Sequence, residues 1–130
     1  MNSKFEDKIS ELIQLKAEGD YWDFKEMWHS DKADLLHDII CMANNLVNRD
    51  CYIIFGVTDD YEIVGINTEN NRKNQQKIID FLRNQHFDGG FRPNVYVRTI
   101  TLESKKVDII IIKNSTNTPY TTLTKNCKPL

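Results

Sequence analysis

The sequence predicts a single α+β domain in which helices pack on a mixed β-sheet. The chain has 130 residues, the usual length of one domain. Three segments repeat their apolar residues with a helical period, and five others read as strands. The expected order is helix, strand, helix, two strands, helix, two strands, without internal repeats or low-complexity linkers. Such a mixture of helices and strands is typical of the α+β class.

The first helix is expected over residues 3–17. Ser3 and Glu6 fit a capping box, an apolar stripe follows at helical spacing, and Gly19 is expected to end the helix. A short aromatic strand is expected at 21–26. A second helix is expected over about 31–48, with a broad apolar face.

The segment CYIIFGV, residues 51–57, is the most strongly predicted strand. Its nearly continuous apolar run indicates a strand that is covered on both faces. We expect residues 62–66 to return as a second strand, in a hairpin centred on Asp59 and Asp60. A third helix should begin near residue 70. It should end before the glycines and proline of 87–93.

The last two strands are expected over 94–103 and 105–114, as a second hairpin that turns at Ser104 or Lys105.

Charged residues are distributed unevenly along the chain. Residues 1–70 carry 15 acidic and 6 basic residues, a net charge of −9, and residues 71–130 carry 4 acidic and 11 basic residues, a net charge of +7. This asymmetry indicates an acidic site beside a basic surface, although a solvated face would also explain it.

Three acidic residues are candidates for a metal site. Glu18 follows the first helix, Asp23 lies in the next strand, and Asp59 follows the strongest strand. If they converge, their oxygens would suit Mg²⁺ or Mn²⁺, and such a metal can activate water against a phosphodiester. Acidic residues are also common at helix ends, on solvated strands and in turns, so a solubilising role stays open.

Alternation along the strand places Asp23 and Lys25 on one side and Trp22 and Phe24 on the other, facing the core. Lys25 could bind a phosphate or pair with Asp23. Tyr21 and Trp28, at the strand ends, are the freer candidates for stacking on a nucleotide. The residues expected to bind nucleic acid are Lys25, Arg72, Lys73, Lys77, Arg92, Arg98, Lys105 and Lys106.

Several classes of protein are not supported. No apolar run reaches the roughly 20 residues of a membrane helix, and the first residues lack a secretory apolar region. The sequence has no P-loop or dinucleotide-binding motif and no Ser-His-Asp pattern. Its three cysteines are odd in number and lack C-x-x-C spacing. We therefore expect a cytoplasmic protein without a disulfide framework.

Four segments together resemble one known family: EGDYWDFKEMW, DLLHDIICMANN, CYIIFGVTDDYEIVGI and DIIIIKNSTNTPY. In this order they are similar to the Schlafen-type Alba-like domain, over about Glu18 to Tyr120. The resemblance implies an Alba-like α+β fold that binds DNA or RNA. We therefore expect the N-terminal part of a longer protein, such as a bacterial transcriptional regulator with a C-terminal domain. A homodimer is also expected, because Alba-like domains often pair.

The resemblance also implies an alternative function. The domain of animal Schlafens is similar to a metal-dependent endoribonuclease core with three acidic residues, which correspond by position to Glu18, Asp23 and Asp59. Two departures from the family pattern concern this site. Asp23 is one methylene shorter than the commoner Glu, and NLVNRDC replaces the usual G-G before the main strand.

Overall fold

The computed structural model describes residues 4–44, 48–66, 71–87 and 92–114. Three helices and a four-stranded sheet confirm the predicted α+β class. The elements are α1 (Lys4–Gln14), β1 (Trp22–Lys25), α2 (Lys32–Ala43), β2 (Cys51–Phe55), α3 (Gln75–Arg83), β3 (Val95–Leu102) and β4 (Lys105–Ile112).

The strand order in the sheet is β1-β2-β4-β3. β1 runs parallel to β2, with α2 as the crossover between them, whereas β4 is antiparallel to both of its neighbours. A parallel pair needs such a crossover connection, while β3 and β4 need only a tight turn. Glu103 and Ser104 form that turn with φ angles of 50° and 64°, as in two-residue hairpin turns that follow the twist of the strands.

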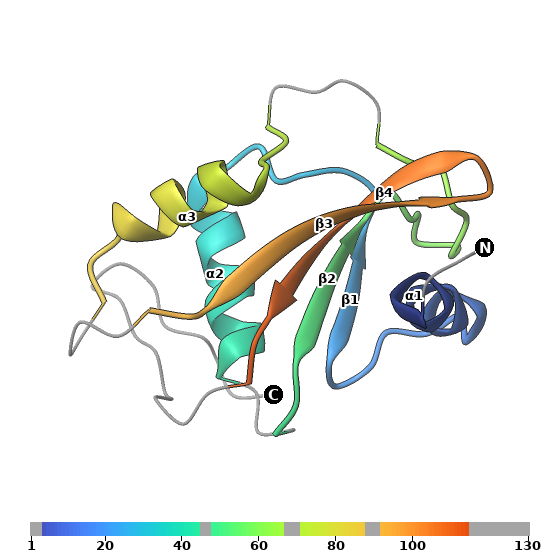
Figure 1. Cartoon of the computed structure of the whole chain (residues 1–130), viewed down its shortest axis with the longest axis horizontal. Helices are drawn as coiled ribbons and strands as arrows, with labels where there is room; N and C mark the ends of the chain where they lie inside the picture. Colours follow the sequence, from blue (N-terminus) through green and yellow to red (C-terminus); the bar gives the residue numbers. More distant parts are fainter. Residues whose placement is uncertain (1–3, 45–47, 67–70, 88–91, 115–130) are drawn as a thin grey trace.

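Helices cover both faces of the sheet (Figure 1). α2 and α3 pack on one face, over the odd-numbered residues of β2, and α1 packs on the other face, over Tyr52 and Ile54. All five residues of β2 are buried. This confirms the prediction, made from the apolar run of this strand, that it is covered on both faces.

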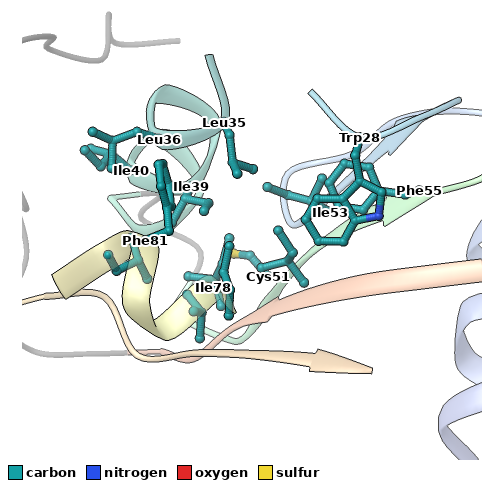
Figure 2. Packing of buried hydrophobic residues seen from close by; sticks show 14 of the residues in the cluster. Trp28, Leu35, Leu36, Ile39, Ile40, Cys51, Ile53, Phe55, Ile78 and Phe81 are labelled. Carbon is teal, nitrogen blue, oxygen red and sulfur yellow. The ribbon is translucent and has the colours of Figure 1, made fainter. Parts of the chain in front are cut away.

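A buried carboxylate lies at one end of the core on the α2 side. Asp108 of β4 is fully buried and accepts hydrogen bonds from the Trp28 indole at 2.9 Å and from the Thr99 hydroxyl at 2.6 Å. Arg72 donates to both Asp108 oxygens, at 2.7 and 2.9 Å. Trp28 in turn stacks on Phe55, with ring centroids 4.1 Å apart (Figure 2). The expectation that Trp28 is free to stack on a nucleotide is therefore wrong.

The predicted strand over 62–66 is replaced by a single antiparallel bridge between Val57 and Ile63. β2 already has β1 and β4 on its two edges, so this segment cannot extend the sheet beside it. The chain instead folds back tightly at Gly56, whose carbonyl accepts bonds from Val64 and Gly65. Both glycines have positive φ, and a Cβ on Gly56 would lie 3.1 Å from the Gly65 backbone.

α1 ends at Gln14, earlier than predicted, and Lys16 adopts a left-handed φ of 51°. Gly19 does not end the helix but lies against the Trp22 ring, where a Cβ would approach within 2.2 Å. The Trp22 indole also donates to the Ala17 carbonyl at 2.8 Å. Ser3 of the expected capping box lies outside the described residues.

Cys41 in α2 is disulfide-bonded, a bond that the cysteine spacing did not indicate. Cys51, at the start of β2, is free and buried. None of the helices in the described part of the chain has the length and apolar character needed to cross a membrane.

Asp108→Asn should lower the free energy of unfolding by about 3 kcal/mol, because it removes the fully buried charge to which Trp28, Thr99 and Arg72 donate hydrogen bonds. Urea denaturation would measure the loss. Asp50→Asn is the matched control, since Asp50 pairs with Lys113 where both side chains are partly exposed, and such a pair contributes about 0–1 kcal/mol. Equal losses in the two variants would contradict the structural role of Asp108.

Candidate nucleic-acid interface and carboxylate pair

Two of the three predicted metal ligands meet beside β1. The Glu18 carboxyl hydrogen-bonds with the Asp23 carboxyl and accepts a bond from the Phe24 backbone. The hydrogen bond with Asp23, burial, and the charge of Asp23 together raise the pKa of Glu18 to about 7, while the Phe24 backbone and Lys25 oppose the shift. Such a pair holds one proton between two carboxyl groups near neutral pH.

The third predicted ligand, Asp59, lies exposed in the turn after β2. Within the described residues, no three His, Cys, Asp or Glu side chains gather in a way that could hold a metal ion. Asp59 therefore does not complete a three-residue cluster with Glu18 and Asp23.

Lys25 belongs to a chain of charged groups on the α2 side of β1. Its ammonium lies 3.4 Å from Asp23 and 3.5 Å from Asp38, and the His29 ring lies 2.6 Å from the same Asp38 oxygen. Burial opposes the charge of Lys25, but the two carboxylates outweigh it and raise the lysine pKa. The predicted alternation of Asp23 and Lys25 to one side of the strand is correct, and their ion pair neutralises much of the lysine charge.

Two other predicted phosphate-binding residues make structural contacts. Arg72 forms its two-pronged pair with the buried Asp108. The Lys105 ammonium donates to the Ile63 carbonyl at 3.0 Å, which ties the turn after β2 to the start of β4. These contacts leave both residues less available to a phosphate than the sequence suggests.

Three lysines approach one another where α2 and α3 begin. Burial lowers the pKa of Lys73, and the charges of Lys32 and Lys77 lower it further. Mutual repulsion of this kind is relieved when an anion binds between the cations. Lys73 and Lys77 were predicted from the sequence, whereas Lys32 was not. We call this group the lysine cluster.

A second basic surface lies on the α1 side of the sheet. Strand register aligns Trp22, Tyr52, Ile111 and Tyr96 in one row across the four strands. Arg98, two residues after Tyr96 in β3, is exposed and its guanidinium lies 4.3 Å from the Phe5 ring centroid. Alternation places Tyr96 and Arg98 on the same face of β3.

Two further cations lie over tyrosine rings on this side. The Arg49 guanidinium is 3.6 Å from the Tyr21 ring centroid. Lys8 of α1 lies between Tyr21 and Tyr52, at 5.7 and 5.8 Å. We call the surface formed by Tyr96, Arg98, Arg49 and Lys8 the sheet-face surface. Its three cations form no ion pair with any residue that the structure describes.

Sequence reasoning missed Lys8 and Arg49. Lys8 follows Phe5 by three residues on the sheet-facing stripe of α1, so its spacing could have placed it beside the sheet. Arg49 precedes the strongest strand by two residues, but nothing in its surroundings indicates a tyrosine partner from another segment. Of the remaining predicted residues, Arg92 and Lys106 are exposed, before β3 and in β4.

Comparison with known families gives one result. A family model described as Schlafen, AlbA_2 matches residues 18–127, which include the carboxylate pair, Arg49 and the whole sheet. No curated protein matches the chain.

Asp23→Asn should return the Glu18 pKa from about 7 toward its ordinary 4.5, because the neighbouring carboxyl that shares the proton is gone. Titration of side-chain carboxyl carbons by NMR would follow this change, with Glu26→Gln as an exposed control. A Glu18 pKa that stays near 7 in Asp23→Asn would contradict the pairing.

The same pair makes stability depend on pH. The folded chain holds the Glu18 proton more tightly than the unfolded chain does. The stabilisation is therefore complete below pH 4.5 and is lost as the pH rises through about 7. Asp23→Asn should remove this part of the pH dependence.

Proposed function

The chain belongs to the Schlafen AlbA_2 family, and from that premise we propose that it is a nucleic-acid-binding domain that contacts its ligand through the sheet-face surface. The family indicates a nucleic-acid-related role in general. The observation that carries the proposal is the set of three cations, Lys8, Arg49 and Arg98, that lie over aromatic rings without an ion pair among the described residues.

The cations of this surface are more available to a phosphate than the other basic residues are. Lys25 is held by two carboxylates and Arg72 by the buried Asp108. An internally paired cation must lose its partner before it can bind a phosphate, and that loss offsets the gain. Within the described part of the chain, Arg98 and Arg49 have no ion pair to lose. Their stacking on rings also holds each guanidinium in place without using its charge.

Aromatic rings extend what this surface can bind. Tyr96 is 45% exposed and lies beside Arg98, so a base and its phosphate could be contacted by neighbouring side chains. Stacking on a tyrosine favours bases in general, because each base has a flat π-face. The surface therefore suits DNA or RNA through charge and stacking rather than through base-edge recognition.

The finer expectation, a role within a bacterial transcriptional regulator, requires selective binding of particular DNA sequences. Competition between a specific and an unrelated DNA would reveal such selectivity.

A C-terminal domain and a homodimer also stay predictions, and a homodimer could form through an edge strand of the sheet. In the described sheet β1 and β3 are the edge strands. The Gln75 side chain covers part of the β3 edge through bonds to Val95 and Val97.

Arg98→Glu should weaken nucleic-acid binding by about tenfold or more and reduce its dependence on salt, because one phosphate contact is lost and a repulsive charge is added. Fluorescence anisotropy between 50 and 200 mM salt, about the range over which such contacts weaken, would measure both effects. Lys77→Glu makes a similar change in charge at the lysine cluster.

A larger loss in Lys77→Glu than in Arg98→Glu would move the interface to the lysine cluster. Binding that is unaffected by both substitutions and by salt would contradict the proposed function itself.

A second candidate function, metal-dependent cleavage of nucleic acid, is favoured by the Glu18–Asp23 pair. Mg²⁺ commonly binds one or two carboxylates and completes its shell with waters and substrate phosphates, so these two carboxyls fit it without Asp59. A divalent cation would take the place of the shared proton. When bound, the metal supplies polarisation of the phosphodiester and a more acidic water.

If the domain is a nuclease, labelled RNA or DNA should be cut in the presence of Mn²⁺ or Mg²⁺, and Glu18→Gln and Asp23→Asn should each lower the rate at least about 100-fold, as expected when a metal ligand is lost. Calorimetric titration with Mn²⁺ gives a readout independent of cleavage. Asp59→Asn tests whether the third acid joins when substrate binds. Cleavage that persists in both Glu18→Gln and Asp23→Asn would indicate a contaminating enzyme.

A further inference from the structure

A groove of about 320 Å³ lies between α3 and the start of β3. Its apolar residues include Ile79, Leu82 and Val95, and its polar lining includes Arg83, Arg92 and Tyr96. Leu82 and Val95 are almost fully buried. The volume is near the lower end of the range for small-molecule sites, which suits one nucleotide and is small for an extended peptide.

The charge of the groove selects for an anion. Arg83 and Arg92 lie close together, since the Arg92 guanidinium donates to the Arg83 carbonyl at 3.5 Å. Among the described residues that line the groove, none is acidic. A ligand with one flat apolar part and one anionic part would satisfy both the apolar residues and the two guanidinium groups. A nucleobase with its attached phosphate has this chemistry.

One wall of the groove is held rigidly. The Gln75 side chain accepts from the Val97 N–H at 2.6 Å and donates to the Val95 carbonyl at 3.2 Å. This amide joins α3 to the edge of β3 and has little capacity left for a ligand. The two elements that form the groove are therefore bonded directly to each other.

The groove lies on the α3 face of the sheet and borders the sheet-face surface at the β3 edge, where Tyr96 belongs to both. Tyr96 lines the groove, and Arg98 follows it on the same face of β3, about 7 Å further along the strand. A strand of nucleic acid with one nucleotide in the groove could thus place its next phosphate at Arg98. In a duplex, both faces of each base are stacked and its edge is paired, so no base could enter the groove without being extruded.

We propose that the groove between α3 and β3 binds an unpaired nucleotide, so that the ligand of this domain is a single strand of nucleic acid rather than a duplex. The inference rests on the proposed function and makes its substrate class more specific. Arg83, Arg92 and Tyr96 are the residues that contact the nucleotide. Arg98 contacts the phosphate that follows.

The test uses fluorescence anisotropy to compare the binding of a 12-nucleotide single strand with that of its duplex. Both strands are tested as RNA and as DNA, so that a preference for either nucleic acid is also measured. The single strand should bind at least tenfold more tightly than the duplex. Tyr96→Leu and Arg92→Gln should each weaken single-strand binding by about tenfold, in keeping with the loss of one stacked base or one phosphate contact. Lys16→Gln, an exposed site after α1, is the control for loss of one charge.

The outcomes separate the two proposals. If neither single strand nor duplex binds, the proposed function fails. If the duplex binds as tightly as the single strand, the inference is overturned and the proposed function stands. If single strands are preferred but Tyr96→Leu and Arg92→Gln bind like Lys16→Gln, the groove is not the site. Because Arg92 is exposed, Arg92→Gln keeps the test valid even if Tyr96→Leu is unstable.

Discussion

The buried carboxylate of Asp108 is the constraint on which much of this structure depends. A charged group inside the core is costly unless its hydrogen bonds are satisfied. Asp108 meets that requirement through Trp28, Thr99 and Arg72. Each of these belongs to a different segment of the chain. One side chain in β4 thereby fixes the loop after β1, the approach to α3 and the neighbouring edge strand.

Fixing these segments also positions the surfaces. Arg72 is followed directly by Lys73, so anchoring of the guanidinium sets where the lysine cluster and α3 begin. α3 and β3 then form the two walls of the groove, and Gln75 ties them together. On the other side of the sheet, α1 covers one part of the face and leaves Tyr96 exposed. The proposed interface thus depends on which part of each sheet face the helices cover.

Much of the fold follows from the sequence because local apolar periodicity determines it. β2, buried on both faces, and the last hairpin match their predicted positions closely. The three helices are present as predicted, but α1 and α2 end earlier and α3 begins later than expected. Residues 62–66 were predicted wrongly because their apolar pattern carries no information about which strands already flank β2. The expectation that Trp28 is free for stacking was wrong for a related reason, because its hydrogen-bond partner Asp108 is 80 residues away in the sequence. An isolated acid within the run VDIIII was the available signal, since it required a buried partner.

The candidate site was only partly predictable. Asp23 and Lys25 share a side of β1, as alternation requires, and Glu18 joins Asp23. Which cations are paired internally could not be read from the sequence, because ion pairs such as Arg72 with Asp108 depend on tertiary contacts. The list of predicted basic residues therefore includes cations that are paired internally, and it omits Lys8 and Arg49, which belong to the proposed interface.

The location of the ligand on the α1 side of the sheet is the central claim, and NMR mapping of the unmodified protein tests it most directly. Titration with a short single strand should shift the backbone and side-chain signals of Tyr96, Arg98, Arg49 and Lys8. The signals of Lys32, Lys73 and Lys77 should change little. Shifts confined to the lysine cluster, with Tyr96 and Arg98 unchanged, would contradict the claim.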